Sequence, residues 1–158
     1  MQTEPQRERD PIYFSQLTER PPGAIAQMKG IDPDSPISGW VRFYQTAYGV
    51  LLTAEIWGLP SLSGSCRGGF YGFHIHKDAH YNPYACEHPK HAGDLPPLLS
   101  TKDGYAYLSV LSDRFSVKEI IGLTVVIHKN PDDFTSQPSG NAGSQLATGR
   151  IVPGKTIR

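Results

Sequence analysis

The sequence predicts an all-β domain, either a sandwich or a barrel, on three observations. The 158-residue chain contains 16 glycines and 14 prolines, and its valine, isoleucine, threonine, tyrosine and phenylalanine residues fall in short runs. This composition favours strands joined by turns over long helices. Polarity roughly alternates along residues 40–45 and 51–57, as it does in strands with one face on a core and the other in water. The length fits a single domain that buries enough surface to fold unaided.

The elements follow one another in a regular order. Residues 1–22 are polar and end in Pro21-Pro22, so we expect an N-terminal arm followed by a compact domain over residues 23–158. From there, short apolar runs alternate with turn signals and predict seven or eight strands. These runs cover residues 24–30, 39–45, 49–60, 68–76, 104–112, 120–128 and 145–152.

Two stretches are expected to be long loops. Residues 77–101 are rich in histidine, proline and aspartate, and residues 129–144 are polar with several glycines and prolines. Loops of this length inside a compact domain are usually functional. Both loops also adjoin histidines.

Charge and composition exclude several classes of partner. Lysine plus arginine and aspartate plus glutamate both number 15, so nothing indicates a nucleic acid or a membrane surface as a partner. The first twenty residues are charged where a signal peptide would be apolar, so we expect a cytoplasmic protein. A leader removed before Met1 would leave the same sequence. The only cysteines, Cys66 and Cys86, form no C-x-x-C pair, and they are either one disulfide or two inert thiols.

The six histidines are the candidate metal ligands. His74 and His76 are two residues apart in a predicted strand, so both imidazoles project from one face and can meet one metal. The alternative is a pair of surface histidines. His128 ends the run 120–128, where taken alone it reads as a histidine with an ordinary hydrogen bond at a strand end.

A second set of possible ligands crowds into the loop 77–101. Three imidazoles and one carboxylate make a complete tetrahedral zinc set with no position left for water, which is typical of a structural site. These four possible ligands are His80, His88, His91 and Asp94. The alternative interpretation is a solvated, histidine-rich loop.

The segments GFHIH, HYNP, HAGDLP, VVIH followed by PDD, and SGNAGSQLATG resemble, in this order, the signatures of the copper/zinc superoxide dismutase family. The likeness covers residues 24–152 and is to the bacterial type with a shortened zinc and disulfide loop. It implies an eight-stranded Greek-key β-barrel with two long functional loops. It also implies copper bound by His74, His76, His80 and His128, and zinc bound by His80, His88, His91 and Asp94. Asp132 would link a copper histidine to a zinc histidine through their remaining N–H groups.

The resemblance implies that superoxide is disproportionated to oxygen and hydrogen peroxide, with His80 as the bridging and proton-carrying residue. The family usually places an arginine where this chain has Gln145. Losing that positive charge should slow an electrostatically steered reaction by about tenfold or more, unless Lys129 or Arg150 compensates. We therefore expect a slower enzyme, with Gln145 as a site residue.

The family's disulfide is also expected to be absent. Thr148 stands in place of its second cysteine, and the segment between His76 and His80 is too short to hold the first. A monomer or a non-standard dimer is therefore expected, and Cys66 and Cys86 could form a replacement bridge. Two other readings stay open: a non-catalytic module that stores or buffers copper and zinc, and a β-sandwich interaction domain in which the histidines are incidental.

Overall fold

In the computed structural model, the structure describes residues 14–60 and 68–154. Within this part of the chain, short helices and strands are joined by long loops. The helices are α1 (Phe14–Thr18) and α2 (Val117–Ile120). The strands are β1 (Ala24–Gly30), β2 (Ser38–Thr46), β3 (Gly49–Trp57), β4 (Phe70–Tyr71), β5 (Phe73–Lys77), β6 (Ala79–His80), β7 (Leu98–Leu99), β8 (Ala106–Ser112), β9 (Thr124–His128) and β10 (Gln145–Pro153).

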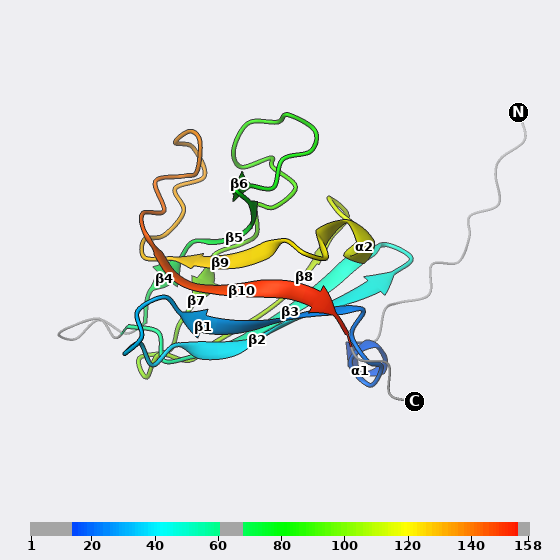
Figure 1. Cartoon of the computed structure of the whole chain (residues 1–158), viewed down its shortest axis with the longest axis horizontal. Helices are drawn as coiled ribbons and strands as arrows, with labels where there is room; N and C mark the ends of the chain where they lie inside the picture. Colours follow the sequence, from blue (N-terminus) through cyan, green and yellow to red (C-terminus); the bar gives the residue numbers. More distant parts are fainter. Residues whose placement is uncertain (1–13, 61–67, 155–158) are drawn as a thin grey trace, which may run out of the picture.

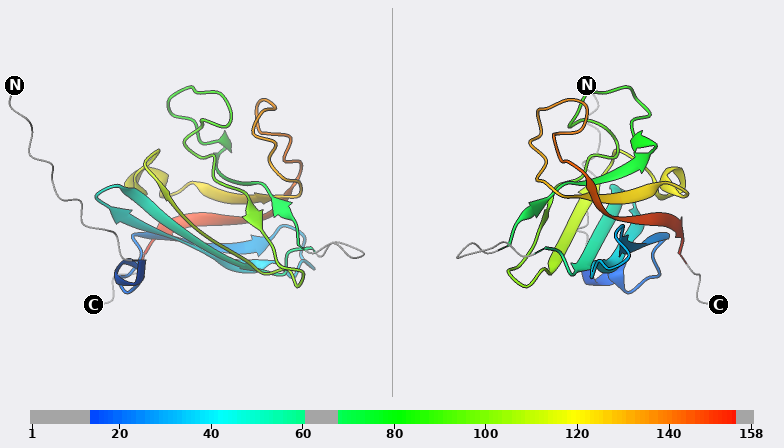
Figure 2. Two further views of the ribbon diagram at one scale, coloured as in Figure 1. Left: turned by 180° about the vertical axis from the view of Figure 1, so that it is seen from behind. Right: turned by 60° about the vertical axis from the view of Figure 1, so that its left-hand side comes forward.

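The strands form one curled antiparallel sheet and a small second sheet. The large sheet has eight strands in the order β6-β5-β9-β10-β1-β2-β3-β8, and β4 pairs with β7. Strands β5 and β9, and likewise β3 and β8, are neighbours although they are distant in the sequence, which is the connectivity of a Greek key. The views from opposite sides show the sheet curling around the core (Figures 1 and 2). The all-β Greek-key barrel predicted from the sequence is confirmed.

The core lies inside the curl and is built from alternate residues of each strand. In β2, for example, Val41 and Phe43 are fully buried, whereas Trp40 and Arg42 between them are half-buried on the outer face. Period-2 burial of this kind is what a half-buried strand requires. The buried cluster includes Ala24, Ala26, Met28, Leu52, Ala54, Ile56, Phe73, Ile75, Val125, Ile127, Ala147 and Ile151.

Both long loops rise from the same side of the sheet, above β5 and β9 (Figures 1 and 2). The loop after β9 is anchored at its base, where Lys129 N–H donates to Ser144 O and Asn130 N–H donates to Ala142 O, both at 2.8 Å. Gly72, between β4 and β5, lets this loop approach closely, because a Cβ there would meet the Ala142 methyl at 2.8 Å. The fold therefore places both loops beside the strands that carry the histidines.

The structure corrects the expected elements in three places. Residues 77–101 are not wholly loop, because they contain β6 and β7. The run 120–128 becomes a strand only from Thr124, and it is preceded by α2. Helix α1 lies within the expected arm, and residues 1–13 of that arm lie outside the described residues. The boundary between arm and barrel stays a prediction. None of the helices among the described residues is long and apolar enough to cross a membrane.

Candidate metal centre

A tight hairpin brings three histidines together. His74 and His76 both lie on β5, two residues apart, and so share one face of the strand. In the pairing of β5 with β6, His76 lies directly opposite His80. The chain reverses at Asp78, which takes the left-handed conformation with φ of 69°, a region that aspartate tolerates better than most residues. The short segment after H-x-H thus sets the position of His80 by strand register.

His128 completes the first cluster from the neighbouring strand. It ends β9, and its Nε2 lies 3.4 Å from His76 Nε2. One ring nitrogen from each of His74, His76, His80 and His128 lies within 4.8 Å of the others. The four predicted copper ligands therefore converge on one point.

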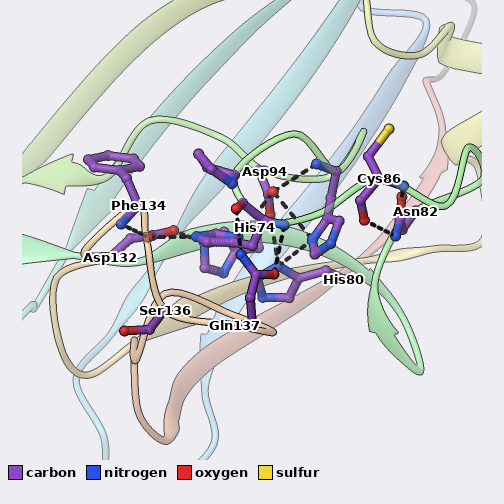
Figure 3. A network of polar contacts seen from close by, with 12 residues as sticks. His74, His80, Asn82, Cys86, Asp94, Asp132, Phe134, Ser136 and Gln137 are labelled. Carbon is purple, nitrogen blue, oxygen red and sulfur yellow. Dashed lines mark hydrogen bonds and ion pairs between the residues drawn. The ribbon is translucent and has the colours of Figure 1, made fainter.

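The second cluster lies in the loop between β6 and β7 and shares His80 with the first. His80 Nδ1 lies 2.7 Å from Asp94 Oδ1 and 3.3 Å from His91 Nδ1. His88 Nδ1 lies 3.1 Å from Asp94 Oδ2. Figure 3 shows His80 and Asp94 facing each other, with His74 beside them. The four predicted zinc ligands His80, His88, His91 and Asp94 thus form a second group.

Backbone hydrogen bonds hold the loop between β6 and β7, residues 81–97 and called the zinc loop below, against β5. Tyr81 N–H donates to Ile75 O, Gly93 N–H donates to Tyr81 O, and Ile75 N–H donates to Gly93 O, each at 2.8 Å. Gly93 is required there, because a Cβ at this position would clash with Ile75 O. Asp94 is consequently set opposite His74 in an isolated bridge.

The residues fit two metal ions, as three orphaned nitrogens indicate. His74 Nδ1, His80 Nε2 and His88 Nδ1 are buried without a hydrogen-bond partner, which native proteins rarely tolerate. His88 Nδ1 is close to Asp94 but lacks hydrogen-bond geometry. Two ligands of a tetrahedral zinc ion, each about 2.0–2.1 Å from the metal, are roughly 3.3 Å apart. The 3.3 Å between His80 Nδ1 and His91 Nδ1 matches that separation.

Asp132 joins the two clusters. Its Oδ2 accepts a hydrogen bond from His74 Nε2 at 2.7 Å, and its Oδ1 accepts one from His88 Nε2 at 2.8 Å. Both rings therefore turn their Nδ1 lone pairs toward the clusters. Gly140 packs against this bridge with φ of +68°, and a Cβ there would lie 2.6 Å from His88 Nε2 and clash with Asp132.

A carbonyl group orients His128 in the same way. Its Nδ1 donates to Gly143 O at 3.0 Å, so its Nε2 is free to face the first cluster. Gly143 itself lies near the end of the loop 129–144, which therefore contacts both clusters.

Burial and neighbouring groups together favour the protonation states that metal binding needs in several of the ligands. Desolvation, followed by the neighbouring His80, lowers the pKa of His74 to about 4 and that of His76 to about 3. Burial also lowers the pKa of His128. Burial alone would raise the pKa of Asp94, but the hydrogen bond from His80 and the nearby imidazoles outweigh it, so the pKa is lowered. At neutral pH the imidazoles of His74, His76 and His128 are therefore neutral and the Asp94 carboxylate is charged, as metal binding requires.

Gln145 lies beside the first cluster. In the pairing of β10 with β9 it is directly opposite His128, and its side chain is exposed. Arg150 pairs with Thr124 at the other end of β9, about 13 Å along the strand from His128. Lys129 is exposed and follows His128 directly.

One of the two cysteines lies among the described residues. Cys86 is half-buried and forms no disulfide with another described residue, and its main-chain N–H and C=O are both hydrogen-bonded to the side chain of Asn82 (Figure 3). Cys66 lies outside the described residues. The Cys66–Cys86 bridge therefore stays a prediction.

Sequence reasoning missed two residues that contact the zinc loop. Arg114 Nη1 donates to Pro89 O at 2.9 Å and to His91 O at 3.2 Å. Gln137 hydrogen-bonds to the main chain of His88. Neither residue belongs to a motif, because each acts on backbone atoms that are distant in the sequence, so nothing in the sequence signals these contacts.

Comparisons with known proteins agree with this geometry. The family model described as copper/zinc superoxide dismutase matches residues 37–151, more than half of the chain. A copper/zinc superoxide dismutase of Legionella pneumophila is 34% identical over 131 residues, covering 72% of this chain and 76% of the relative. A second relative, from Aquifex aeolicus, is 30% identical, and the alignment covers 77% of this chain and 82% of the relative. A third, from Arabidopsis thaliana, is 31% identical, and the alignment covers 84% of this chain and 93% of the relative.

Proposed function

The chain belongs to the copper/zinc superoxide dismutase family, and we propose that it disproportionates superoxide more slowly than it would with an arginine at position 145. The observation that carries the catalytic function is the sharing of His80 between a four-histidine cluster and a cluster of three histidines and Asp94. In such a pair of sites, copper supplies the one-electron redox change, and zinc, which has no redox chemistry, holds the shared imidazole.

We propose His80 as the residue that carries a proton to the reduced oxygen species. Its Nδ1 is engaged beside Asp94 at 2.7 Å, whereas its Nε2 is buried without a partner. Nε2 is therefore the one ring atom at which His80 can take up and release a proton. Imidazole is the side-chain group that most often transfers protons in enzymes, which suits His80 to this role.

Asp132 would keep the neighbouring rings fixed while His80 acts. Its carboxylate is bonded to His74 and His88 and also accepts the Phe134 N–H at 2.7 Å. Burial alone would raise the pKa of Asp132, but these hydrogen bonds lower it. A charged, three-fold bonded carboxylate is a rigid acceptor, which supports an orienting role.

The proposal of a slowed enzyme is supported by the charges around Gln145. This residue lies opposite His128 and carries no charge. It also lines a hollow with Asp32 and Asp34, both exposed carboxylates, and none of the residues lining that hollow is a lysine or arginine. A hollow lined by two carboxylates and by no lysine or arginine does not attract an anion such as superoxide.

The subtype and oligomeric state are also proposals. We assign the chain to the bacterial type with a shortened loop, because the one-residue reversal at Asp78 leaves no room for a loop cysteine between His76 and His80. Without that loop, a monomer or a non-standard dimer is the expected state. Sedimentation velocity at several protein concentrations tests this expectation, and a tight dimer that retains the usual family interface would contradict it.

The second candidate function is a non-catalytic module that stores or buffers copper and zinc. The lack of a cation at Gln145 favours it, since binding a metal does not require attraction of an anion. The retention of a complete four-histidine cluster favours the enzyme, because one strong metal-binding site would be enough for storage.

One experiment separates the two functions. The protein is reconstituted with one copper and one zinc per chain, metal content is determined on the same sample, and the dismutation rate is measured against a zinc-only sample. A copper-dependent rate supports the enzyme. Full occupancy of both metals without dismutation would reject it in favour of the binding module.

A further inference from the structure

Gln137, in the loop 129–144, uses both ends of its side-chain amide on one residue of the zinc loop. Its Oε1 accepts the His88 N–H at 3.0 Å, and its Nε2 donates to His88 O at 2.8 Å. The two residues are 49 positions apart in the sequence. Gln137 therefore holds the main chain of His88 on both sides from a different loop.

His88 needs such a partner. Its side chain and main chain are 4% exposed, yet it lies in a stretch between β6 and β7 with no strand pairing of its own. Buried backbone N–H and C=O groups must find hydrogen-bond partners, or burial costs free energy. Gln137 supplies one partner for each group.

The ring of His88 is fixed by the same loop. Its Nε2 is bonded to Asp132 Oδ1 at 2.8 Å, and its Nδ1 is buried with no hydrogen-bond partner, near Asp94. With the main chain and Nε2 both held by the loop 129–144, Nδ1 is the only polar atom of His88 left to bind a metal.

We propose that Gln137 is a positioning residue for zinc, which holds His88 in place and couples the order of the loop 129–144 to zinc binding. The same loop orients His74 through Asp132 and His128 through Gly143 O. Coupling between two sites is reciprocal. Zinc therefore stabilises the loop that orients the first cluster, and an ordered loop strengthens zinc binding. This inference rests on the proposed zinc site.

The test measures zinc affinity in copper-free protein by competition with a chromophoric chelator. Gln137→Met keeps the length of the side chain and removes both hydrogen bonds, whereas Gln137→Glu keeps the acceptor for His88 N–H and loses the donor. Because Gln137 is exposed, neither variant opens a cavity in the core. We expect zinc to bind about tenfold more weakly to Gln137→Met, with Gln137→Glu between this variant and the wild type.

Gln45 provides a matched control. It is an exposed glutamine whose Oε1 accepts the Val117 N–H at 2.9 Å and whose Nε2 donates to Thr46 O at 3.3 Å. Gln45→Met thus removes two similar bonds away from both metal clusters, and its zinc affinity should equal that of the wild type. Equal losses in Gln45→Met and Gln137→Met would overturn the proposal, because they would reflect general stability.

Hydrogen exchange provides a readout that a purely structural role would not change. Zinc should slow exchange of the Gly140 amide, which donates to Ser136 O within the loop, in the wild type but much less in Gln137→Met. Equal zinc-induced protection in both proteins would overturn the coupling. Failure of the wild type itself to bind zinc would instead reject the proposed zinc site, so the two failures are distinguishable.

Discussion

Replacement of Gln145 by arginine should speed the reaction. Gln145→Arg places a permanent positive charge opposite His128, at the first cluster. At a separation of about 6 Å, two unit charges attract by roughly 0.7 kcal/mol in bulk water and roughly 3 kcal/mol at the effective dielectric of a protein surface. Since about 1.4 kcal/mol is tenfold in rate, these limits bracket an increase of roughly 3-fold to 100-fold. We expect about tenfold at low salt.

The assay is pulse radiolysis of protein loaded with copper and zinc, at ionic strengths from about 0.01 to 0.15 M. The Debye length shortens over this range from about 30 to 8 Å, so the advantage of Gln145→Arg should shrink as salt rises. Gln145→Met, which is neutral and similar in length, is the control and should match the wild type. An arginine variant that is no faster than the wild type at any salt concentration would refute the reasoning, as would an increase that salt leaves unchanged.

Three further substitutions test other parts of the centre. Gly140→Ala should weaken zinc binding by about 10-fold to 100-fold, because the new methyl group would displace the contact between Asp132 and His88. Its control is Gly122→Ala, which has a similar left-handed φ of +90° but whose new methyl group would make only an ordinary contact with Arg150 at 3.8 Å. Equal zinc affinity in the two variants would contradict the assigned cause. Arg114→Ala removes two hydrogen bonds to the carbonyls of Pro89 and His91, so urea unfolding of the zinc-bound protein should show a free energy of unfolding lower by about 1–3 kcal/mol. Lys118, which is also exposed, is the control, and Lys118→Ala should change this free energy little. Equal effects of the two substitutions would remove any special role for Arg114. His128→Ala should remove the copper-dependent activity and leave zinc affinity nearly unchanged, since His128 belongs to the first cluster alone. Equal loss of both metals in a chelator titration would argue against separate sites.

The strands and the ligand set were predictable from local sequence patterns. The spacing of His74 and His76 fixes a shared face in any strand, whatever its neighbours. His80, His88, His91 and Asp94 were recognisable because three imidazoles and a carboxylate close together in the sequence have few other uses. The alternation along residues 40–45 likewise anticipated β2.

The elements that were missed are short or depend on distant partners. Strand β6 has two residues and exists only because His76 pairs with His80, so no periodicity reveals it. Helix α2 had a local signal that was overlooked, a capping box in which Glu119 accepts the Ser116 N–H at 2.6 Å. The contacts of Arg114 and Gln137 to backbone carbonyls and amides carry no sequence signature, because any residue can offer a backbone atom.

Anomalous diffraction from crystals of the oxidised protein loaded with copper and zinc, recorded at both metal edges, tests the bridged centre most directly. The account predicts a copper peak among His74, His76, His80 and His128, and a zinc peak among His80, His88, His91 and Asp94, with the His80 imidazole between the two. A single shared metal position, or two metals with His80 bound to only one of them, would contradict it.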